Sequence, residues 1–254
     1  EFRRVLFRSQ AIKAINDGFT KYTQVDGIPE LKKSIITKFE SDNDLKYDLD
    51  QITVGVGGKH VIYNLFMSTL NKNDEVIIPS PYWVSYPDMV SLAGGKPIIL
   101  ETEMKDNFKI IPKQLEANIS EKTKWFIINS PGNPTGAVYD KTELKEISKV
   151  LLKNPHVNIL SDDIYEHITY GTKFYNVLNV EPKLYENTFI VNGVSKAFSM
   201  TGWRIGYGAG KKELIKAISK IQSQSTTNPC SISQVAAKHA LQSEKNFLQD
   251  WLKK

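Results

Sequence analysis

A lysine and an arginine lie eight positions apart in a crowded run of small and aromatic residues, and this pairing suits chemistry on a carbonyl group. Lys196 comes soon after residues 188–191, a β-branched apolar run that predicts a short buried strand. Open α/β sheets place functional side chains at the carboxyl ends of their strands. A lysine held there can be partly desolvated, and its neutral amine attacks carbonyl carbons. Taken alone, Lys196 is more simply explained as a solvent-exposed loop lysine.

Two further turns place polar groups directly after predicted strands. Residues 54–59, Val-Gly-Val-Gly-Gly-Lys, join a strand to a helix, and backbone N–H groups in such a turn bind anions. The turn matches neither a dinucleotide fingerprint, because His60 occupies the third glycine position, nor a Walker loop. Asn133 lies in the turn formed by residues 129–136, which contains two prolines and two glycines. A turn of that composition is rigid, so it can aim the Asn133 amide at a ligand.

A pair of carboxylates ends another predicted strand. Asp162 and Asp163 are adjacent, and Tyr165 lies three residues beyond the first of them. The four histidines are scattered without the spacing of metal ligands, so we expect no metal site and interpret Asp162 as the partner of one cation. Together, a lysine nucleophile, a carboxylate, a tyrosine, an amide, an anion-binding turn and Arg204 are the groups that a pyridine aldehyde phosphate requires.

Alternating strands and helices are expected to position these groups. Apolar, β-branched runs predict strands at residues 51–54, 75–79, 96–100, 124–128, 157–160 and 188–191. Helical periodicity covers residues 31–39, 59–70, 142–152, 211–222 and 231–252. Alternation of this kind predicts an α/β fold with a mostly parallel sheet covered on both faces.

Composition narrows the class of protein. The net charge is +5 over 254 residues with no dense basic cluster, so a nucleic-acid partner is not expected. No apolar run approaches the length needed to span a bilayer, so a membrane partner is not expected either. Cys230 is the single cysteine, which excludes an internal disulfide framework and fits a reducing compartment such as the cytoplasm.

The two ends of the chain suggest a fragment. Residues 1–9, Glu-Phe-Arg-Arg-Val-Leu-Phe-Arg-Ser, join poorly to the residues after them and are predicted to be translated vector or adapter sequence. At the other end, residues 250–254 stop inside a helical pattern without a cap. We therefore expect residues 10–254 to be an incomplete cofactor-binding large domain that lacks an N-terminal segment and a C-terminal small domain.

With these motifs in order, the sequence resembles the class I aminotransferases, which are fold-type I pyridoxal-phosphate enzymes, and specifically their aspartate aminotransferase-like branch. The resemblance implies a three-layer α/β/α large domain. It implies that Lys196 forms the covalent link to the cofactor and later moves a proton. It implies that Asp162 faces the pyridine nitrogen, and that Arg204 pairs with the phosphate. The other cofactor-binding residues implied are Tyr165, Asn133, Trp83, Gly57, Gly58, Lys59, Tyr22 and Ser195.

At two positions this chain differs from what the family usually carries. Family members often place a serine phosphate ligand three residues before the lysine, and here that position is Gly193. Ser195 is the candidate to replace it. The second carboxylate, Asp163, occupies a position where the family usually has glutamate, and we expect it to support structure.

The resemblance also implies which residues lie outside this chain and how the protein assembles. It places the arginine that binds the substrate α-carboxylate beyond Lys254, so we expect residues 1–254 alone to be inactive or poorly folded. It implies a homodimer with shared active sites, in which Tyr22 reaches the phosphate site of the partner and residues 223–228 also serve that site.

Transamination between an amino acid and a 2-oxo acid is the predicted reaction. Lys59 occupies a position where this branch can hold a distal carboxylate, which favours aspartate and glutamate over aromatic amino acids. The alternatives are an aminotransferase for aromatic or other amino acids, or a carbon–sulfur lyase or decarboxylase on the same scaffold. A non-enzymatic cofactor-binding regulator or nucleotide-binding domain is the least favoured, because Lys196, Asp162 and Arg204 are all present.

Overall fold

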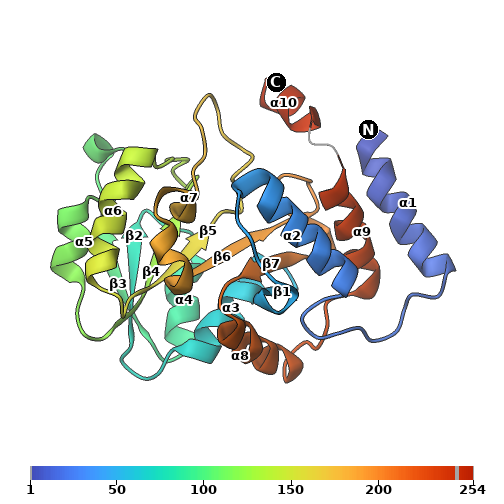
Figure 1. Ribbon diagram of the computed structural model, residues 1–254, viewed down its shortest axis with the longest axis horizontal. Helices are drawn as coiled ribbons and strands as arrows, with labels where there is room; N and C mark the ends of the chain where they lie inside the picture. The colour runs from blue at the N-terminus through green and yellow to red at the C-terminus, as the bar shows by residue number, and fades with distance from the viewer. Residues whose placement is uncertain (1, 244–245, 254) are drawn as a thin grey trace. The chain divides into compact units, whose positions relative to one another are not determined.

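The computed structural model describes residues 2–243 and 246–253, and the chain divides into two compact units. The first unit comprises Glu1–Asn64 and Asn192–Lys254, and the second comprises Leu65–Val191. The strands follow the order β1-β7-β6-β5-β4-β2-β3 in one mostly parallel sheet (Figure 1). The predicted α/β class and the parallel sheet are therefore confirmed.

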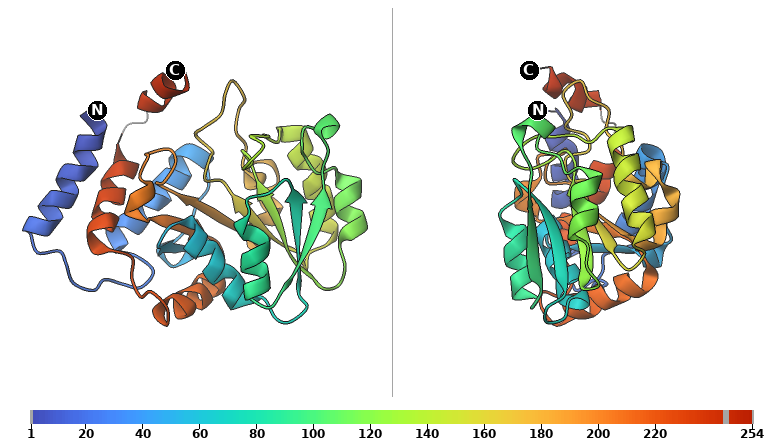
Figure 2. Two further views of the ribbon diagram at one scale, coloured as in Figure 1. Left: turned by 180° about the vertical axis from the view of Figure 1, so that it is seen from behind. Right: turned by 90° about the vertical axis from the view of Figure 1, so that its left-hand side faces the viewer.

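The second unit is built from parallel strands alternating with helices. Its strands are β2 (Glu75–Ser80), β3 (Lys96–Glu101), β4 (Thr123–Asn129), β5 (Asn158–Asp162) and most of β6 (Thr188–Gly193). Its helices are α4 (Ser85–Leu92), α5 (Pro112–Asn118), α6 (Lys141–Lys153) and α7 (Val177–Val180). Parallel neighbours need crossover connections, and Figure 2 shows α4 on one face of these strands and α5 and α6 on the other.

Register within this unit places the polar strand ends side by side. In the β4–β5 ladder Asn129 pairs with Asp162, and in the β5–β6 ladder Asp162 pairs with Val191. The strand interiors are hydrophobic and buried; Phe126, Leu160 and Phe189 are fully inaccessible to solvent. Burial of both faces fixes the register, because a shift by one residue would reverse every side chain.

The first unit is mostly helical around two antiparallel strands. The strands are β1 (Ile52–Gly55) and β7 (Gly206–Ala209), which pair along their whole length. The helices are α1 (Phe2–Asn16), α2 (Pro29–Asn43), α8 (Lys212–Ser223), α9 (Ser231–Gln242) and α10 (Asn246–Leu252); α3 (Gly58–Thr69) begins in this unit and ends in the other. Both α1 and α2 pack against α9. Short 3₁₀ helices occur at Leu49–Gln51, Met104–Asp106, Pro182–Asn187 and Thr201–Trp203.

The predicted strands are all present, with ends that differ by one or two residues. Strand β7 was missed because three of the four residues in Gly-Tyr-Gly-Ala are small and show no apolar alternation. Helices α1, α4, α5 and α7 were also missed. The predicted helical region from 231 to 252 is confirmed as α9 and α10, and residues 244–245 lie outside the described residues.

Helix α1 includes most of the segment predicted to derive from vector or adapter sequence. The ring of Phe7 packs edge-to-face against Trp203 at a centroid distance of 5.9 Å. Packing says nothing about the origin of a segment, so the boundary at residue 9 stays a prediction, as does the incompleteness of residues 10–254.

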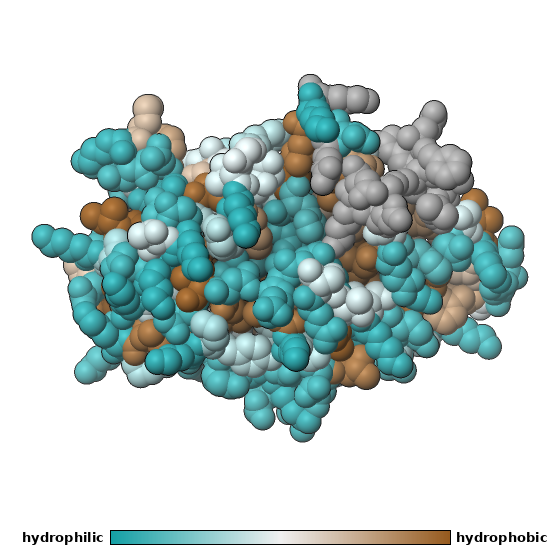
Figure 3. Space-filling model, turned by 45° about the horizontal axis from the view of Figure 1, so that its top comes forward, coloured by the Kyte–Doolittle hydropathy of each residue, from teal (hydrophilic) through white to brown (hydrophobic). Residues whose placement is uncertain are grey.

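The surface carries scattered apolar side chains. Figure 3 shows hydrophobic residues dispersed among hydrophilic ones on the face it presents. Exposed examples are Val84, Leu92, Met104 and Tyr170. Within the described part of the chain, no helix combines the length and hydrophobicity required to cross a bilayer.

Candidate functional site

In the second unit, Asp162 is a buried carboxylate at the carboxyl end of β5. The residue is only 5% exposed. The hydroxyl of Tyr86, from α4, donates to Oδ2 at 2.7 Å, and the backbone N–H of Ile164 donates to Oδ1 at 3.3 Å. Burial, followed by the negative charge of Asp162, raises the pKa of Tyr86 well above its usual value. Tyr86 therefore remains protonated at neutral pH and donates its hydroxyl hydrogen to Asp162.

Aromatic side chains surround this carboxylate. Trp83 packs edge-to-face on Tyr86, with ring centroids 5.3 Å apart. Tyr165 lies close enough to Tyr86 to contribute to the rise of its pKa. Trp83 and Tyr165 are both half-buried, so part of each ring is accessible to a ligand. The second unit thus brings three predicted site residues, Asp162, Tyr165 and Trp83, around one buried phenol that the sequence analysis missed.

The side-chain amide of Asn133 makes no hydrogen bond with any described residue. Its backbone N–H donates to the side-chain oxygen of Asn129 at 2.8 Å, but its own amide makes no hydrogen bond within the described ranges. A cavity of about 30 Å³ is lined by Asn133, Asn129 and Tyr86 among others. That volume holds a water molecule or two and is too small for an amino acid.

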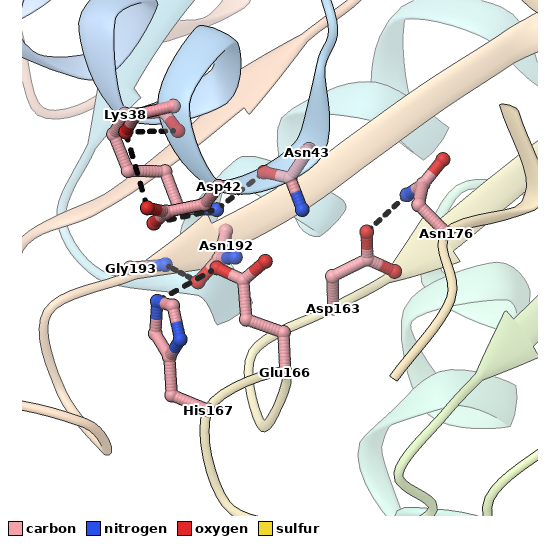
Figure 4. Close-up of polar contacts among 10 residues, drawn as sticks. Lys38, Asp42, Asn43, Asp163, Glu166, His167, Asn176, Asn192 and Gly193 are labelled. Atoms are coloured by element: carbon pink, nitrogen blue, oxygen red, sulfur yellow. Dashed lines mark hydrogen bonds and ion pairs between the residues drawn. The ribbon is translucent and has the colours of Figure 1, made fainter. Parts of the chain in front are cut away.

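The second carboxylate of the pair has a structural role. Ser161 donates its hydroxyl to Asp163 at 2.7 Å, and the amide of Asn176 donates to the other oxygen (Figure 4). Asn176 also caps α7, because its side-chain oxygen accepts from Leu178 N–H at 2.8 Å. Asp163 therefore anchors the loop that leads into α7, as expected from the sequence.

In the first unit, Lys196 follows β6 in a turn of its own. Its backbone carbonyl accepts from Ser199 N–H at 3.0 Å, and its side chain is exposed. The partial desolvation of Lys196 stays a prediction. Ser195 is half-buried, and its hydroxyl makes no hydrogen bond with any described residue.

The glycine turn and Arg204 lie against one another in this unit. Gly57 has φ +90°, and a Cβ built on it would lie 2.9 Å from Cζ of Arg204. The guanidinium donates from Nη1 to the carbonyl of Thr201 at 2.8 Å and from Nη2 to that of Val56 at 3.3 Å. Arg204 itself has φ +54°, an uncommon backbone conformation that such packing can hold. Absence of a side chain at Gly57 is what lets the guanidinium lie beside the turn.

Gly206 closes the same turn from β7. A Cβ at Gly206 would fall 2.7 Å from Cα of Gly58, and closer still to backbone atoms of Gly57 and Gly58. Only glycine allows this approach, because backbone atoms cannot move aside as a flexible side chain can. Nothing in the sequence distinguished Gly206 from an ordinary turn glycine.

His60 supports the first part of the turn. Its Nδ1 accepts from Val56 N–H at 3.3 Å, and its buried Nε2 has no hydrogen-bond partner among the described residues. Burial lowers the pKa of His60. The neutral ring is therefore the form that the folded turn prefers, since protonation of Nδ1 would remove the acceptor for Val56.

This histidine predicts a stability that depends on pH. The folded-state pKa of His60 lies below its unfolded value of about 6.5, so the unfolded chain binds the proton first as the pH falls. The stabilisation from neutral His60 is present above that pH and is lost as the pH falls through the folded pKa. We expect the free energy of unfolding to fall more between pH 7.5 and 5.5 in the unmodified full-length protein than in His60→Gln, measured by urea denaturation. Equal losses in the two proteins would contradict this role.

Tyr22 projects from a well-anchored segment. Tyr22 is 89% exposed. The segment around it is fixed by hydrogen bonds from side chains of α8 and α9. Gln222 donates to the carbonyl of Val25 at 2.6 Å, Gln234 donates to the hydroxyl of Thr23 at 3.0 Å, and Ser231 donates to the carbonyl of Phe19 at 2.7 Å. The ring is therefore presented outward by a segment that is fixed on both sides of it.

The predicted site residues divide between the two units. The second unit holds Asp162, Tyr165, Asn133 and Trp83, which suit a pyridine ring and its oxygen. The first holds Lys196, Ser195, Arg204, Gly57, Gly58, Lys59 and Tyr22, which suit an aldehyde and a phosphate.

Comparison with known proteins gives the family. The model for "Aminotransferase class I and II" matches residues 5–254. The chain belongs to this aminotransferase family. Its resemblance to the aspartate aminotransferase-like branch is confirmed by individual relatives.

Curated relatives and solved structures agree with this assignment. A Rickettsia bellii protein named "Probable aspartate/prephenate aminotransferase" is 62% identical, covering 95% of this chain and 61% of its own length. The "Aspartate/prephenate aminotransferase" of Cereibacter sphaeroides is 57% identical, covering 95% and 60%. The crystal structure of the aspartate aminotransferase from Rhizobium meliloti matches with a TM-score of 0.96 at 47% identity, covering 97% of this chain and 62% of that one.

A further solved structure, aspartate aminotransferase from Thermus thermophilus with maleate, has a TM-score of 0.91 at 41% identity and covers 97% of this chain and 63% of that one. This aminotransferase chain thus spans about three fifths of the length of these relatives. Class I and II aminotransferases generally use pyridoxal phosphate, which is the cofactor that the sequence analysis predicted.

Proposed function

We propose that this chain is the cofactor-binding part of a pyridoxal-phosphate-dependent aminotransferase that acts on an amino acid and a 2-oxo acid. The observation that carries the proposal is the buried Asp162 carboxylate, held by the Tyr86 hydroxyl at 2.7 Å in a member of this family. A positively charged group beside a buried carboxylate offsets part of its desolvation, and a protonated pyridine nitrogen would add such a charge beside Asp162. No observation on the described residues favours a lyase, a decarboxylase or a regulator over an aminotransferase.

The residues present fit this cofactor. The Asn133 amide is unoccupied by described residues and can donate to the ring oxygen, as can the phenol of Tyr165. The Gly57–Gly58 turn has no side chains to fill the space beside Arg204, whose planar guanidinium suits a phosphate. Trp83 offers a half-buried ring for stacking. Lys59, Ser195 and Tyr22 are proposed as further ligands, Tyr22 in the site of a partner subunit.

Each residue then has a physical task. When bound, pyridoxal phosphate withdraws electrons from the substrate Cα and carries the amino group between the two half-reactions. Asp162 holds a proton on the ring nitrogen, Tyr165 and Asn133 orient the ring oxygen, and Arg204 neutralises the phosphate. Lys196 provides the amine that binds the aldehyde, and the same amine moves a proton to or from the substrate Cα.

An acidic amino acid is the proposed substrate. The Thermus thermophilus relative was solved with maleate, a dicarboxylate, and the curated relatives are named for aspartate and prephenate. Lys59 is exposed at the start of α3 and carries the charge that a distal carboxylate requires. A homodimer and a cytoplasmic location are proposed with it; the single cysteine, free Cys230, supports the reducing compartment.

Substitution of Lys59 tests the choice of substrate. In full-length Lys59→Ala we expect kcat/KM for aspartate to fall about 10- to 100-fold, because loss of one charged hydrogen bond removes roughly 1.5–3 kcal/mol of binding. For an uncharged amino acid, kcat/KM should change little. Steady-state kinetics on both substrates measure the two effects, and equal losses would leave Lys59 with its cofactor-binding role alone and overturn its role in substrate choice.

The reaction itself is tested in the full-length protein. Borohydride reduction should trap pyridoxal phosphate on Lys196, identified by peptide mass spectrometry. In a separate, unreduced sample, a half-reaction should convert aspartate to its 2-oxo acid without loss of CO₂ and without cleavage of a side-chain bond. Trapping with release of CO₂ or of a side-chain fragment would support the lyase or decarboxylase alternative, and failure to trap any adduct would overturn the proposal.

A further inference from the structure

One asparagine side chain joins the two ring-binding elements of the second unit. Asn129 is the last residue of β4, and its amide Nδ2 donates to the backbone carbonyl of Asp162 at 2.9 Å. Its Oδ1 accepts from the backbone N–H of Asn133 at 2.8 Å. Both ends of a single planar amide are therefore used, one toward β5 and one toward the loop after β4.

The orientation of this amide is determined by its partners. A carbonyl can only accept and an N–H can only donate. If the Asn129 amide were rotated by 180°, its Oδ1 would face the Asp162 carbonyl, and both are acceptors. Its Nδ2 would face the Asn133 N–H, and both are donors. Asn129 is half-buried, and its two partners belong to the two backbone segments whose side chains face the proposed pyridine ring. The amide plane thus sets the spacing between the Asp162 and Asn133 backbones.

We propose that Asn129 is a positioning residue that fixes Asp162 and Asn133 relative to one another, and thereby aims the carboxylate and the amide at opposite parts of the cofactor ring. The inference rests on the proposed function for the identity of the ligand. It does not require Asn129 to touch that ligand.

The β4–β5 pair supplies a matched control. Asn158 begins β5, and its Nδ2 donates to the backbone carbonyl of Lys124 in β4 at 3.2 Å. This bond has the same chemistry and joins the same two strands, but lies at the opposite end of the ladder, where Asn158 pairs with Trp125. Loss of either side-chain amide weakens the pairing of β4 with β5. Only Asn129, however, forms hydrogen bonds with the backbones of Asp162 and Asn133.

The first test uses cofactor-free full-length protein. Hydrogen exchange at the Asn133 backbone N–H should become about tenfold faster in Asn129→Ala, because one hydrogen bond is lost. It should be unchanged in Asn158→Ala. In Asn129→Asp the protection should be retained, since a carboxylate oxygen also accepts from Asn133. Unchanged exchange in Asn129→Ala would overturn the proposal whether or not the protein binds pyridoxal phosphate.

The second test uses the protein loaded with pyridoxal phosphate. In Asn129→Ala the pH midpoint of the cofactor's visible absorption should rise by about one unit, because the Asn133 amide no longer favours the ionised ring oxygen. The dissociation constant for the cofactor should rise about tenfold, and Asn158→Ala should change neither value. Equal shifts in the two variants would reduce Asn129 to a purely structural residue. Absence of any visible band in the unmodified protein would instead overturn the proposed function, leaving the exchange result to decide the role of Asn129.

Discussion

Replacing Asp162 with asparagine should lower kcat for transamination by about 1,000-fold in the full-length protein. At an effective dielectric near 20, the pairing of a carboxylate with a protonated ring nitrogen about 4 Å away is worth on the order of 4 kcal/mol, which converts to roughly three factors of ten in rate. Asparagine keeps the shape, and its amide oxygen can still accept from Tyr86. The substitution therefore removes the charge with little change in packing. Steady-state and half-reaction kinetics measure the loss.

The neighbouring carboxylate provides the control for this substitution. Asp163 directly follows the same strand and is equally buried, but it binds Ser161 and Asn176. Asp163→Asn should lower the free energy of unfolding while leaving most of kcat. Borohydride trapping on Lys196 should persist in Asp162→Asn, since the lysine is unchanged. If the two variants lost kcat equally, the charge of Asp162 would have no special role.

Replacing Gly206 with alanine should damage the phosphate end of the site. The added Cβ would lie 2.7 Å from Cα of Gly58 and nearer still to other backbone atoms of the turn. Such overpacking typically costs about 1–3 kcal/mol and here must displace the turn beside Arg204. We expect the dissociation constant for pyridoxal phosphate to rise at least about tenfold, and Tm to fall, in calorimetry and fluorescence titration of the full-length protein.

Gly202 is the matched control for this change. It lies four residues earlier in the same segment, and a Cβ built on it would meet no atom within 4 Å. Gly202→Ala should therefore bind the cofactor normally. Pyridoxal, which lacks the phosphate, should bind Gly206→Ala about as well as it binds the unmodified protein. A comparable loss for pyridoxal and its phosphate would indicate general unfolding rather than a displaced phosphate turn.

The sequence by itself determined the α/β class and the six strands that it marks with β-branched apolar runs, and it supplied the prediction of which groups bind the cofactor. Buried parallel strands have continuous apolar sequences, and functional side chains of α/β proteins commonly follow the carboxyl ends of such strands. Lys196, Asp162 and Arg204 could be singled out for these reasons before any contact was known. The family assignment followed from their order along the chain.

Only the tertiary structure decided which groups support those residues. Tyr86 is 76 positions from Asp162, and α4, which packs against β2 and β3 in the second unit, brings its hydroxyl to the end of β5. Asn129 acquires its role from strand register, which places it opposite Asp162. Gly206 is required because β7, whose small residues gave no strand signal, lies against the glycine turn. Contacts of this kind depend on how segments that are distant in sequence pack together, and the local hydrophobic periodicity of a sequence does not predict that packing.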